Sequence, residues 1–237
     1  MNLAVWSGPR NISTALMYSF GNRDDFEIID EPFYSNYLIE TGLDHPMREE
    51  IILSQPENID QIILTLSQKR PIAGKSLYQK HMSQHMTNSI PRNWFNQVKH
   101  VFLLRHPARV ISSFAKKYDN FSENDIGFKK QVELFSEVIK QGLDPIVVNS
   151  EDIRKSPEQT LTKICERLNI CFQKSMLSWP KGGNNDDGVW ASHWYESAHE
   201  STGFSGPESL LPVLEGTNLK LVEASLPLYR ALLKFAI

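Results

Sequence analysis

Residues 3–14 read LAVWSGPRNIST, an apolar run that breaks at Ser7 and gives way to polar residues. Apolar residues then recur at helical spacing from about Ser13, so the stretch predicts a strand, a short loop and a helix. Free backbone N–H groups and the helix dipole favour an anion at such a loop. Ser13 and Thr14 add hydroxyl donors, and Arg10 adds a permanent charge that can bind phosphate in a bidentate way. The segment predicts a phosphate-binding loop; the structural alternative is a turn capped by Ser13 with Arg10 on the surface.

A second stretch, VKHVFLLRHPARVISS at residues 98–113, repeats this order of elements. Residues 98–104 predict a buried strand, and Pro107 suits the first position of a helix running to about residue 117. Arg105 follows the strand directly, and Ser113 lies within the helix. Both side chains can reach an anion at the start of that helix, so we expect a second phosphate grip there.

The rest of the chain alternates between strand and helix patterns. Strands are predicted at 27–30 and 145–149. An extended stretch is predicted at 72–73 and again at 77–78, before the basic Gln79-Lys80-His81. Helices are predicted at 58–67, 132–141, 156–168 and about 219–235, the last interrupted at Pro227. Alternating strands and helices favour a three-layer α/β/α fold around a central parallel sheet, formed by one domain over residues 1–237.

Composition narrows the classes of partner. The net charge of −3 argues against a general nucleic-acid binder, which would be strongly basic. The longest apolar runs fall short of the roughly 18 residues that a membrane span needs. We therefore expect a soluble, cytoplasmic protein with no nucleic-acid or membrane partner, and no sequence feature indicates an oligomeric state.

The two phosphate grips lack the features of a site for a nucleoside triphosphate. The first loop lacks the second glycine and the Lys-Ser/Thr pair of a Walker A motif, and the strand at 98–104 has no aspartate to hold Mg²⁺. Phosphoryl transfer normally uses Mg²⁺ to neutralise developing charge. A sulfuryl group carries less charge than a terminal phosphoryl group, so protein cations can neutralise it without a metal. We expect a reaction that requires no metal.

Together the two stretches resemble the sulfotransferase family, whose loop reads roughly PKSGTT or PRSGTS and whose later motif reads RDPRDVxxSY. Arg105 and Ser113 have the spacing of the family's Arg and Ser, which bind the 3'-phosphate of 3'-phosphoadenosine 5'-phosphosulfate. The resemblance places the 5'-phosphosulfate on the residues Arg10, Asn11, Ile12, Ser13 and Thr14. Lys181 and Gly182 resemble the family's later RKG segment and would close over the 3'-phosphate.

The likeness runs in a consistent order over roughly residues 3 to 190. It is nearest to sulfotransferase-like proteins with a WPRNISTALMYSF-type loop, some of which are joined to a branched-chain aminotransferase-like region. This sequence departs from the usual pattern at Ile12, where the family has glycine, and at His106, where it often has aspartate.

Two residues are candidates for the base that sulfuryl transfer to a hydroxyl needs. Glu31, at the end of the strand 27–30, resembles the catalytic glutamate of tyrosylprotein sulfotransferases; a helix N-terminal acid or an arginine partner is the structural alternative. His81 follows Lys80 and loosely resembles the Lys-x-His stretch of cytosolic sulfotransferases; a surface or core histidine is the alternative. Arg10 would steady the leaving phosphate.

The resemblance implies transfer of a sulfuryl group from 3'-phosphoadenosine 5'-phosphosulfate, the co-substrate, to a hydroxyl or amine of a small-molecule acceptor. Two alternatives stay open: a Mg²⁺-dependent, kinase-like P-loop protein, and a non-catalytic nucleotide-binding domain. We expect segments 33–57 and 115–130 to form the acceptor pocket. The polar, glycine-rich segment 181–206 is expected to be a functional loop, whose aromatic residues stack on adenine, frame the acceptor or simply pack.

Overall fold

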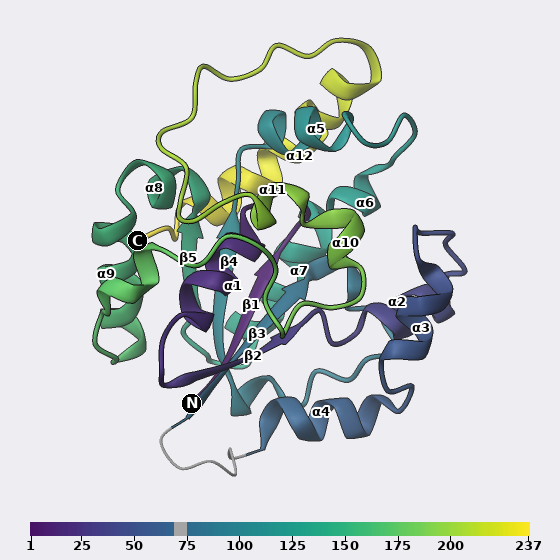
Figure 1. Cartoon of the computed structure of the whole chain (residues 1–237). Helices are drawn as coiled ribbons and strands as arrows, with labels where there is room; N and C mark the ends of the chain where they lie inside the picture. Colours follow the sequence, from purple (N-terminus) through teal and green to yellow (C-terminus); the bar gives the residue numbers. More distant parts are fainter. Residues whose placement is uncertain (69–74) are drawn as a thin grey trace.

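The computed structural model describes residues 1–68 and 75–237 (Figure 1). Five parallel strands form one sheet in the order β2-β3-β1-β4-β5. The strands are β1 (Asn2–Ser7), β2 (Phe26–Asp30), β3 (Ser76–Met82), β4 (Lys99–Leu104) and β5 (Ile146–Asn149). Because every strand is parallel, all five carboxyl ends meet at one edge of the sheet, where ligands of open α/β folds bind.

Helices connect and cover the strands. In chain order they are α1 (Ser13–Gly21), α2 (Tyr34–Thr41), α3 (Arg48–Ser54), α4 (Ile59–Ser67), α5 (Pro107–Phe114), α6 (Glu123–Ile126), α7 (Phe128–Lys140), α8 (Ser150–Lys155), α9 (Pro157–Leu168), α10 (Ala191–Trp194), α11 (Glu196–His199) and α12 (Gly216–Leu233). Short 3-10 turns occur at η1 (Ser83–His85), η2 (Phe95–Gln97) and η3 (Lys174–Leu177). In the part of the chain that the structure describes, no helix is both long and apolar enough to cross a membrane.

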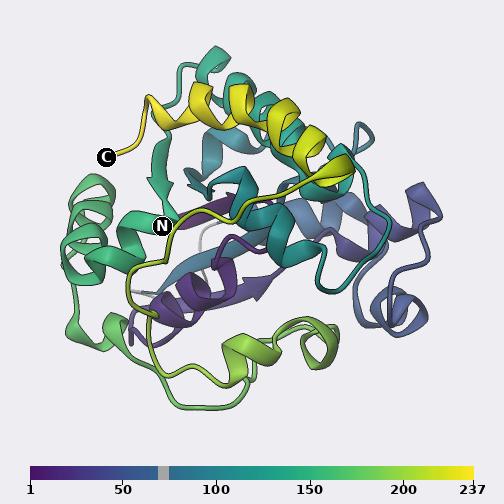
Figure 2. The same ribbon diagram turned by 90° about the horizontal axis from the view of Figure 1, so that it is seen from above.

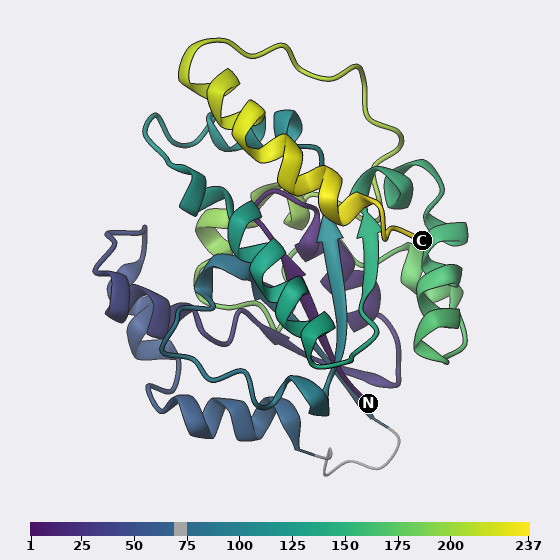
Figure 3. The same ribbon diagram turned by 180° about the vertical axis from the view of Figure 1, so that it is seen from behind.

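The helices form two layers, one on each face of the sheet. Leu16 of α1 and Ile164 of α9 pack with Val5 in one hydrophobic cluster. Helices α4, α5, α7 and α12 pack in a second cluster on the other face, with Trp6 and Phe102. Figures 2 and 3 show α7 and α12 together on one side of the sheet, and Figure 2 shows α1 and α10 on the other. This arrangement confirms the predicted three-layer α/β/α fold with a central parallel sheet.

The structure differs from the predicted elements at several places. Strand β3 continues through Lys80 and His81 to Met82, whereas the sequence suggested an extended stretch that ends before them; residues 72–73 lie outside the described residues. Helices α2 and α3 lie in a segment where no element was predicted. Helix α12 is not interrupted at Pro227 but passes through it. Proline costs the helix a hydrogen bond, and here the buried Val222, Tyr229 and Leu232 anchor it on both sides.

Candidate active site

A cavity of about 560 Å³ lies at the carboxyl edge of the sheet. Its lining includes Arg10 after β1, Glu31 after β2, Gln84 after β3 and Arg105 after β4. Four strand ends therefore contribute to one cavity. The two predicted phosphate grips, which are nearly one hundred residues apart in the sequence, both face it.

The loop between β1 and α1 holds two residues in the left-handed region of backbone space. Arg10 has φ 61° and Ile12 has φ 58°, a region that costs non-glycine residues about 1–2 kcal/mol each. Ile12 thus adopts the backbone conformation that a glycine would take most easily at this position. The Asn11 side chain is buried and donates a 3.0 Å hydrogen bond to the carbonyl oxygen of Leu103, which ties the loop to β4.

The two grips are joined by hydrogen bonds. Nε of Arg10 donates a 2.9 Å hydrogen bond to Oγ of Ser113 in α5, and a guanidinium nitrogen of Arg105 donates a 2.5 Å hydrogen bond to the carbonyl oxygen of Arg10. Burial lowers the pKa of Arg10, and the nearby positive charge of Arg105 lowers it further. Two cations held this close together at a cavity wall favour an anion between them.

A buried ionic network also contributes to the cavity lining. Nζ of Lys80 donates a 3.0 Å hydrogen bond to Asp30, another to Oε1 of Glu31 and a 2.6 Å one to the hydroxyl of Tyr195. The Tyr195 hydroxyl in turn lies 2.8 Å from Oδ2 of Asp30. The side chains of Lys80 and Asp30 are each about 1% exposed, so the lysine charge is compensated almost entirely by protein groups.

Glu31 lines the cavity in a constrained conformation. Its φ of 39° lies in the left-handed region, and Lys80 and Tyr195 both engage Oε1. Oε2 makes no hydrogen bond to any described residue. Burial raises the pKa of Glu31, the charge of Asp30 raises it further, and Lys80 opposes both. A carboxylate with one fixed oxygen, one free oxygen and an increased proton affinity is suited to accept a proton.

His85 lies beside the free oxygen of Glu31. Its ring stacks between Tyr34 and Tyr37, with ring centroids 4.3 and 4.7 Å away, and its Nδ1 lies 3.7 Å from Oε2 of Glu31. Nδ1 is buried and has no hydrogen-bond partner. Burial lowers the pKa of His85 well below its ordinary value, as do the charges of His45, Lys80 and His81, so the ring is neutral at pH 7. The stacking fixes a neutral imidazole at the cavity wall.

His81 is not brought to the cavity. Successive side chains on a strand point to opposite faces, so His81 faces the layer opposite to Lys80. There it stacks on Trp6 at 4.3 Å and interacts with Gln79 through Nε2, 3.1 Å away. Burial first, and the charges of His100 and Lys80 next, lower its pKa to about 3. The geometry favours the alternative of a core histidine.

Lys181 and Gly182 also lie outside the cavity lining. Nζ of Lys181 pairs with a carboxylate oxygen of Glu200 at 2.6 Å, and the lysine side chain is about 62% exposed. Gly182 has φ 107°, a conformation that L side chains rarely adopt, and its N–H donates to the carbonyl of His199. Ser13 and Thr14, which were predicted to bind the 5'-phosphosulfate, do line the cavity at the start of α1.

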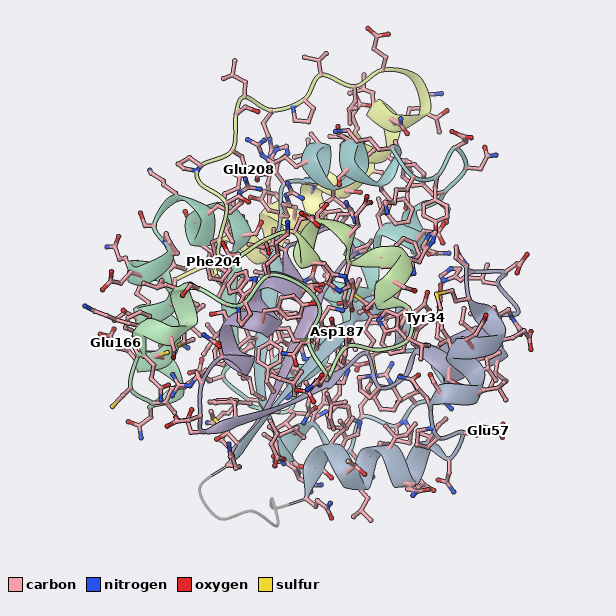
Figure 4. All side chains as sticks on the ribbon, in the orientation of Figure 1. Tyr34, Glu57, Glu166, Asp187, Phe204 and Glu208 are labelled. Atoms are coloured by element: carbon pink, nitrogen blue, oxygen red, sulfur yellow. The ribbon has the colours of Figure 1, made fainter. Side chains whose placement is uncertain are left out.

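Aromatic side chains form much of the remaining wall. Tyr34 and Tyr118 come from the two segments expected to form the acceptor pocket, and Trp194 and Phe204 come from the segment after residue 180 (Tyr34 and Phe204 are labelled in Figure 4). Tyr118 stacks on Trp194 with a centroid distance of 5.4 Å. Trp190, in contrast, is buried and belongs to the hydrophobic core. Flat rings at a cavity wall suit a ligand with an apolar or aromatic body.

Sequence patterns missed the roles that three residues have in this site. The Tyr195 hydroxyl reaches Asp30 from 165 residues away, and His85 follows a strand whose extent was underestimated. Arg154 lines the cavity from α8, a helix that was not predicted separately. The aromatic residues of segment 181–206 were a usable signal for Tyr195, but no local pattern distinguishes Arg154 from an ordinary surface arginine.

The chain is similar in sequence to two known proteins. The chain is 38% identical over 231 residues to branched-chain-amino-acid aminotransferase-like protein 1 of Arabidopsis thaliana, and 35% identical over 230 residues to protein 2 of that name. Each alignment covers 96% of this chain but 40% of the relative, so the chain spans less than half the length of these relatives.

Two solved structures of sulfotransferases share this fold. The sulfotransferase domain from the curacin biosynthetic pathway has a TM-score of 0.61 at 19% identity, covering 95% of this chain and 97% of that one. A sulfotransferase from Alicyclobacillus acidocaldarius has a TM-score of 0.55 at 12% identity, covering 100% and 96%. Residues 1–236 match the family described as the sulfotransferase domain. With both the family match and the fold in agreement, the chain belongs to the sulfotransferase domain family.

Proposed function

We propose that this chain transfers a sulfuryl group from 3'-phosphoadenosine 5'-phosphosulfate to a hydroxyl or amine of a small-molecule acceptor. The observation that supports this most is the shared cavity: guanidinium groups from the ends of β1 and β4 line it together with the free carboxylate oxygen of Glu31. A ligand with phosphate groups at two positions would meet Arg10 and Arg105 at the same time.

The donor's two anionic ends are assigned to different grips. The 3'-phosphate would bind Arg105 and Ser113, and the 5'-phosphosulfate would bind Arg10 with the hydroxyls of Ser13 and Thr14 at the start of α1. The hydrogen bond from Arg10 to Ser113 keeps the two grips adjacent in one cavity.

The reaction follows from the positions of Glu31 and Arg10. The acceptor O–H or N–H gives its proton to Oε2 of Glu31 while the acceptor atom forms a bond to sulfur. The bond between sulfur and the bridging oxygen breaks, and its electron pair leaves with the 5'-phosphate. Arg10 stabilises the charge that develops there, as preorganised cations do in other transfer reactions. Lys80 and Tyr195 hold Oε1 and so orient the carboxylate.

Donor binding is tested by calorimetry with adenosine 3',5'-bisphosphate in the absence of metal. We expect the wild type to bind and Arg105→Ala to bind at least about tenfold more weakly, since a hydrogen bond to a charged group contributes about 1.5–3 kcal/mol. ATP with Mg²⁺ serves as the competing ligand. Tighter binding of ATP with Mg²⁺ than of the bisphosphate would favour a kinase-like activity instead.

Turnover is tested separately, with the sulfuryl donor and a panel of phenols, alcohols and amines. We expect transfer to at least one acceptor class, and its loss in Glu31→Gln. If the wild type binds the bisphosphate but transfers to none of the panel, and Glu31→Gln behaves identically, a non-catalytic nucleotide-binding role replaces this proposal.

A further inference from the structure

Three arginines surround one carboxylate at the edge of the cavity. Arg105 pairs with Oε1 of Glu208, Arg154 reaches the same oxygen at 3.2 Å, and Nε of Arg109 lies 3.3 Å from Oε2. The Glu208 side chain is about 8% exposed. Arg105 and Arg154 line the cavity itself, so the cluster belongs to its wall. Burial alone would raise the pKa of Glu208, but Arg105, Arg154 and Arg109 outweigh it and lower the pKa.

The carboxylate is carried by an irregular segment, residues 205–214, here called the strap. Figures 1 and 4 show the strap arching over the molecule between α11 and α12, with Glu208 on it. The residues on both sides of Glu208 are exposed, so Glu208 is the one that turns inward between 205 and 211.

The strap is attached through the same arginines. Nε of Arg154 donates a 3.1 Å hydrogen bond to the carbonyl of Gly206, and Arg109 donates one of 2.5 Å to the carbonyl of Ser209. Within the described chain, every hydrogen bond of the strap goes to Arg105, Arg109 or Arg154. Without these arginine contacts, the strap would have no hydrogen bond to the rest of the described chain.

We infer that Arg105, Arg109 and Arg154 form an anion site for a phosphate group, and that Glu208 fills this site as an internal substitute which the phosphate must displace. The identification of the phosphate as part of a nucleotide rests on the proposed function. The anion site itself rests on the cluster.

The geometry of the cluster supports displacement over joint occupancy. Three guanidinium groups face the carboxylates of Glu208 and Glu151, the latter 3.0 Å from Arg109, so little positive charge is left for a dianion while Glu208 is present. Nε of Arg105 is buried and has no hydrogen-bond partner, so Glu208 does not use all of its donors. A phosphate offers more acceptor oxygens than a carboxylate and can engage three guanidinium groups together.

The experiment compares Glu208→Gln with the wild type in calorimetric titrations by adenosine 3',5'-bisphosphate and, in parallel, by inorganic pyrophosphate. Glutamine keeps the shape of the side chain and removes the charge. The matched control is Glu215→Gln, which removes the same charge from an exposed residue at the start of α12. We expect Glu208→Gln to bind the bisphosphate at least about fivefold more tightly than the wild type, the lower end of typical coupling between sites. The control should match the wild type.

Hydrogen–deuterium exchange gives a second readout. Residues 205–214 should exchange faster in Glu208→Gln without ligand, and faster in the wild type once the bisphosphate is added. If the wild type binds the bisphosphate and Glu208→Gln binds neither ligand more tightly than the wild type does, the displacement is overturned while the proposed function stays in place. A gain for pyrophosphate alone would support the strap and contradict the nucleotide donor. No binding of either ligand to any variant would overturn both.

Discussion

Nδ1 of His85 lies 3.7 Å from Oε2 of Glu31, a distance too long for a hydrogen bond between them. Neither atom has a hydrogen bond to the described residues, whereas Oε1 of Glu31 is held by Lys80. The oxygen of Glu31 that no described residue holds by a hydrogen bond is therefore Oε2, and a neutral, buried imidazole lies beside it. The proposed transfer uses this oxygen to take the acceptor's proton.

Replacing Glu31 by glutamine should abolish proton removal without disturbing the donor grips. We expect turnover to fall by about 10²–10⁴-fold, the usual contribution of a general base, with unchanged affinity for adenosine 3',5'-bisphosphate. Glu50→Gln, an exposed change in α3, is the control. A Glu31→Gln enzyme with wild-type turnover would remove Glu31 from the mechanism.

The dependence of turnover on pH should follow the ionisation of Glu31. Only the deprotonated carboxylate accepts a proton, and burial raises its pKa above the ordinary value of 4.5, so the rate should rise with pH through that raised pKa. His85 stays neutral above its strongly lowered pKa and should add no separate limb near pH 6.5. The rate profile of His85→Phe checks this assignment: the acid limb should persist in that variant. Disappearance of the limb would identify His85, not Glu31, as the titrating base.

The two grips could be predicted from the sequence because each is a local pattern. Arg10 and Arg105 each follow a short apolar strand, and a parallel sheet brings all strand ends to one edge. The base was harder to assign, because Lys80 and His81 look like the polar end of a strand. Their burial depends on distant residues, since Tyr195 lies 115 positions from Lys80. Once β3 includes both, alternation sends them to opposite faces.

No pattern in the sequence predicts the contact between Arg105 and Glu208. The two residues are 103 positions apart, and Glu208 lies in an irregular segment with no periodicity. The predicted role of Lys181 depended on resemblance alone, and the structure pairs that residue with Glu200 outside the cavity. Contacts made by long irregular segments depend on the tertiary structure, so sequence patterns do not encode them.

The left-handed conformation of Ile12 gives a prediction about stability. Ile12→Ala and Ile12→Gly remove nearly the same packing, but only glycine relieves the strain at φ 58°. We expect the glycine variant to be more stable than the alanine variant by about 1 kcal/mol in denaturant unfolding. At Val213, an exposed residue without a positive φ, the same pair should show the ordinary order, with alanine at least as stable as glycine. Greater stability of Ile12→Ala would contradict the strained loop.

Lys80→Met tests the buried network through its pH dependence. Removing the lysine leaves the carboxylates of Asp30 and Glu31 buried without a counter-ion, which should cost about 3–5 kcal/mol of unfolding free energy near pH 8. Without Lys80 the folded-state pKa of Glu31 rises further above 4.5. A carboxyl group with a raised folded-state pKa contributes its stability below its unfolded pKa, and this contribution is lost as the pH increases through the folded-state pKa. The deficit should therefore shrink as pH falls toward 4.5. Tyr195→Phe keeps the lysine and should cost about 1–3 kcal/mol with little change between these pH values. An equal deficit for Lys80→Met at pH 4.5 and pH 8 would show that the variant is destabilised by lost packing and not by uncompensated charge.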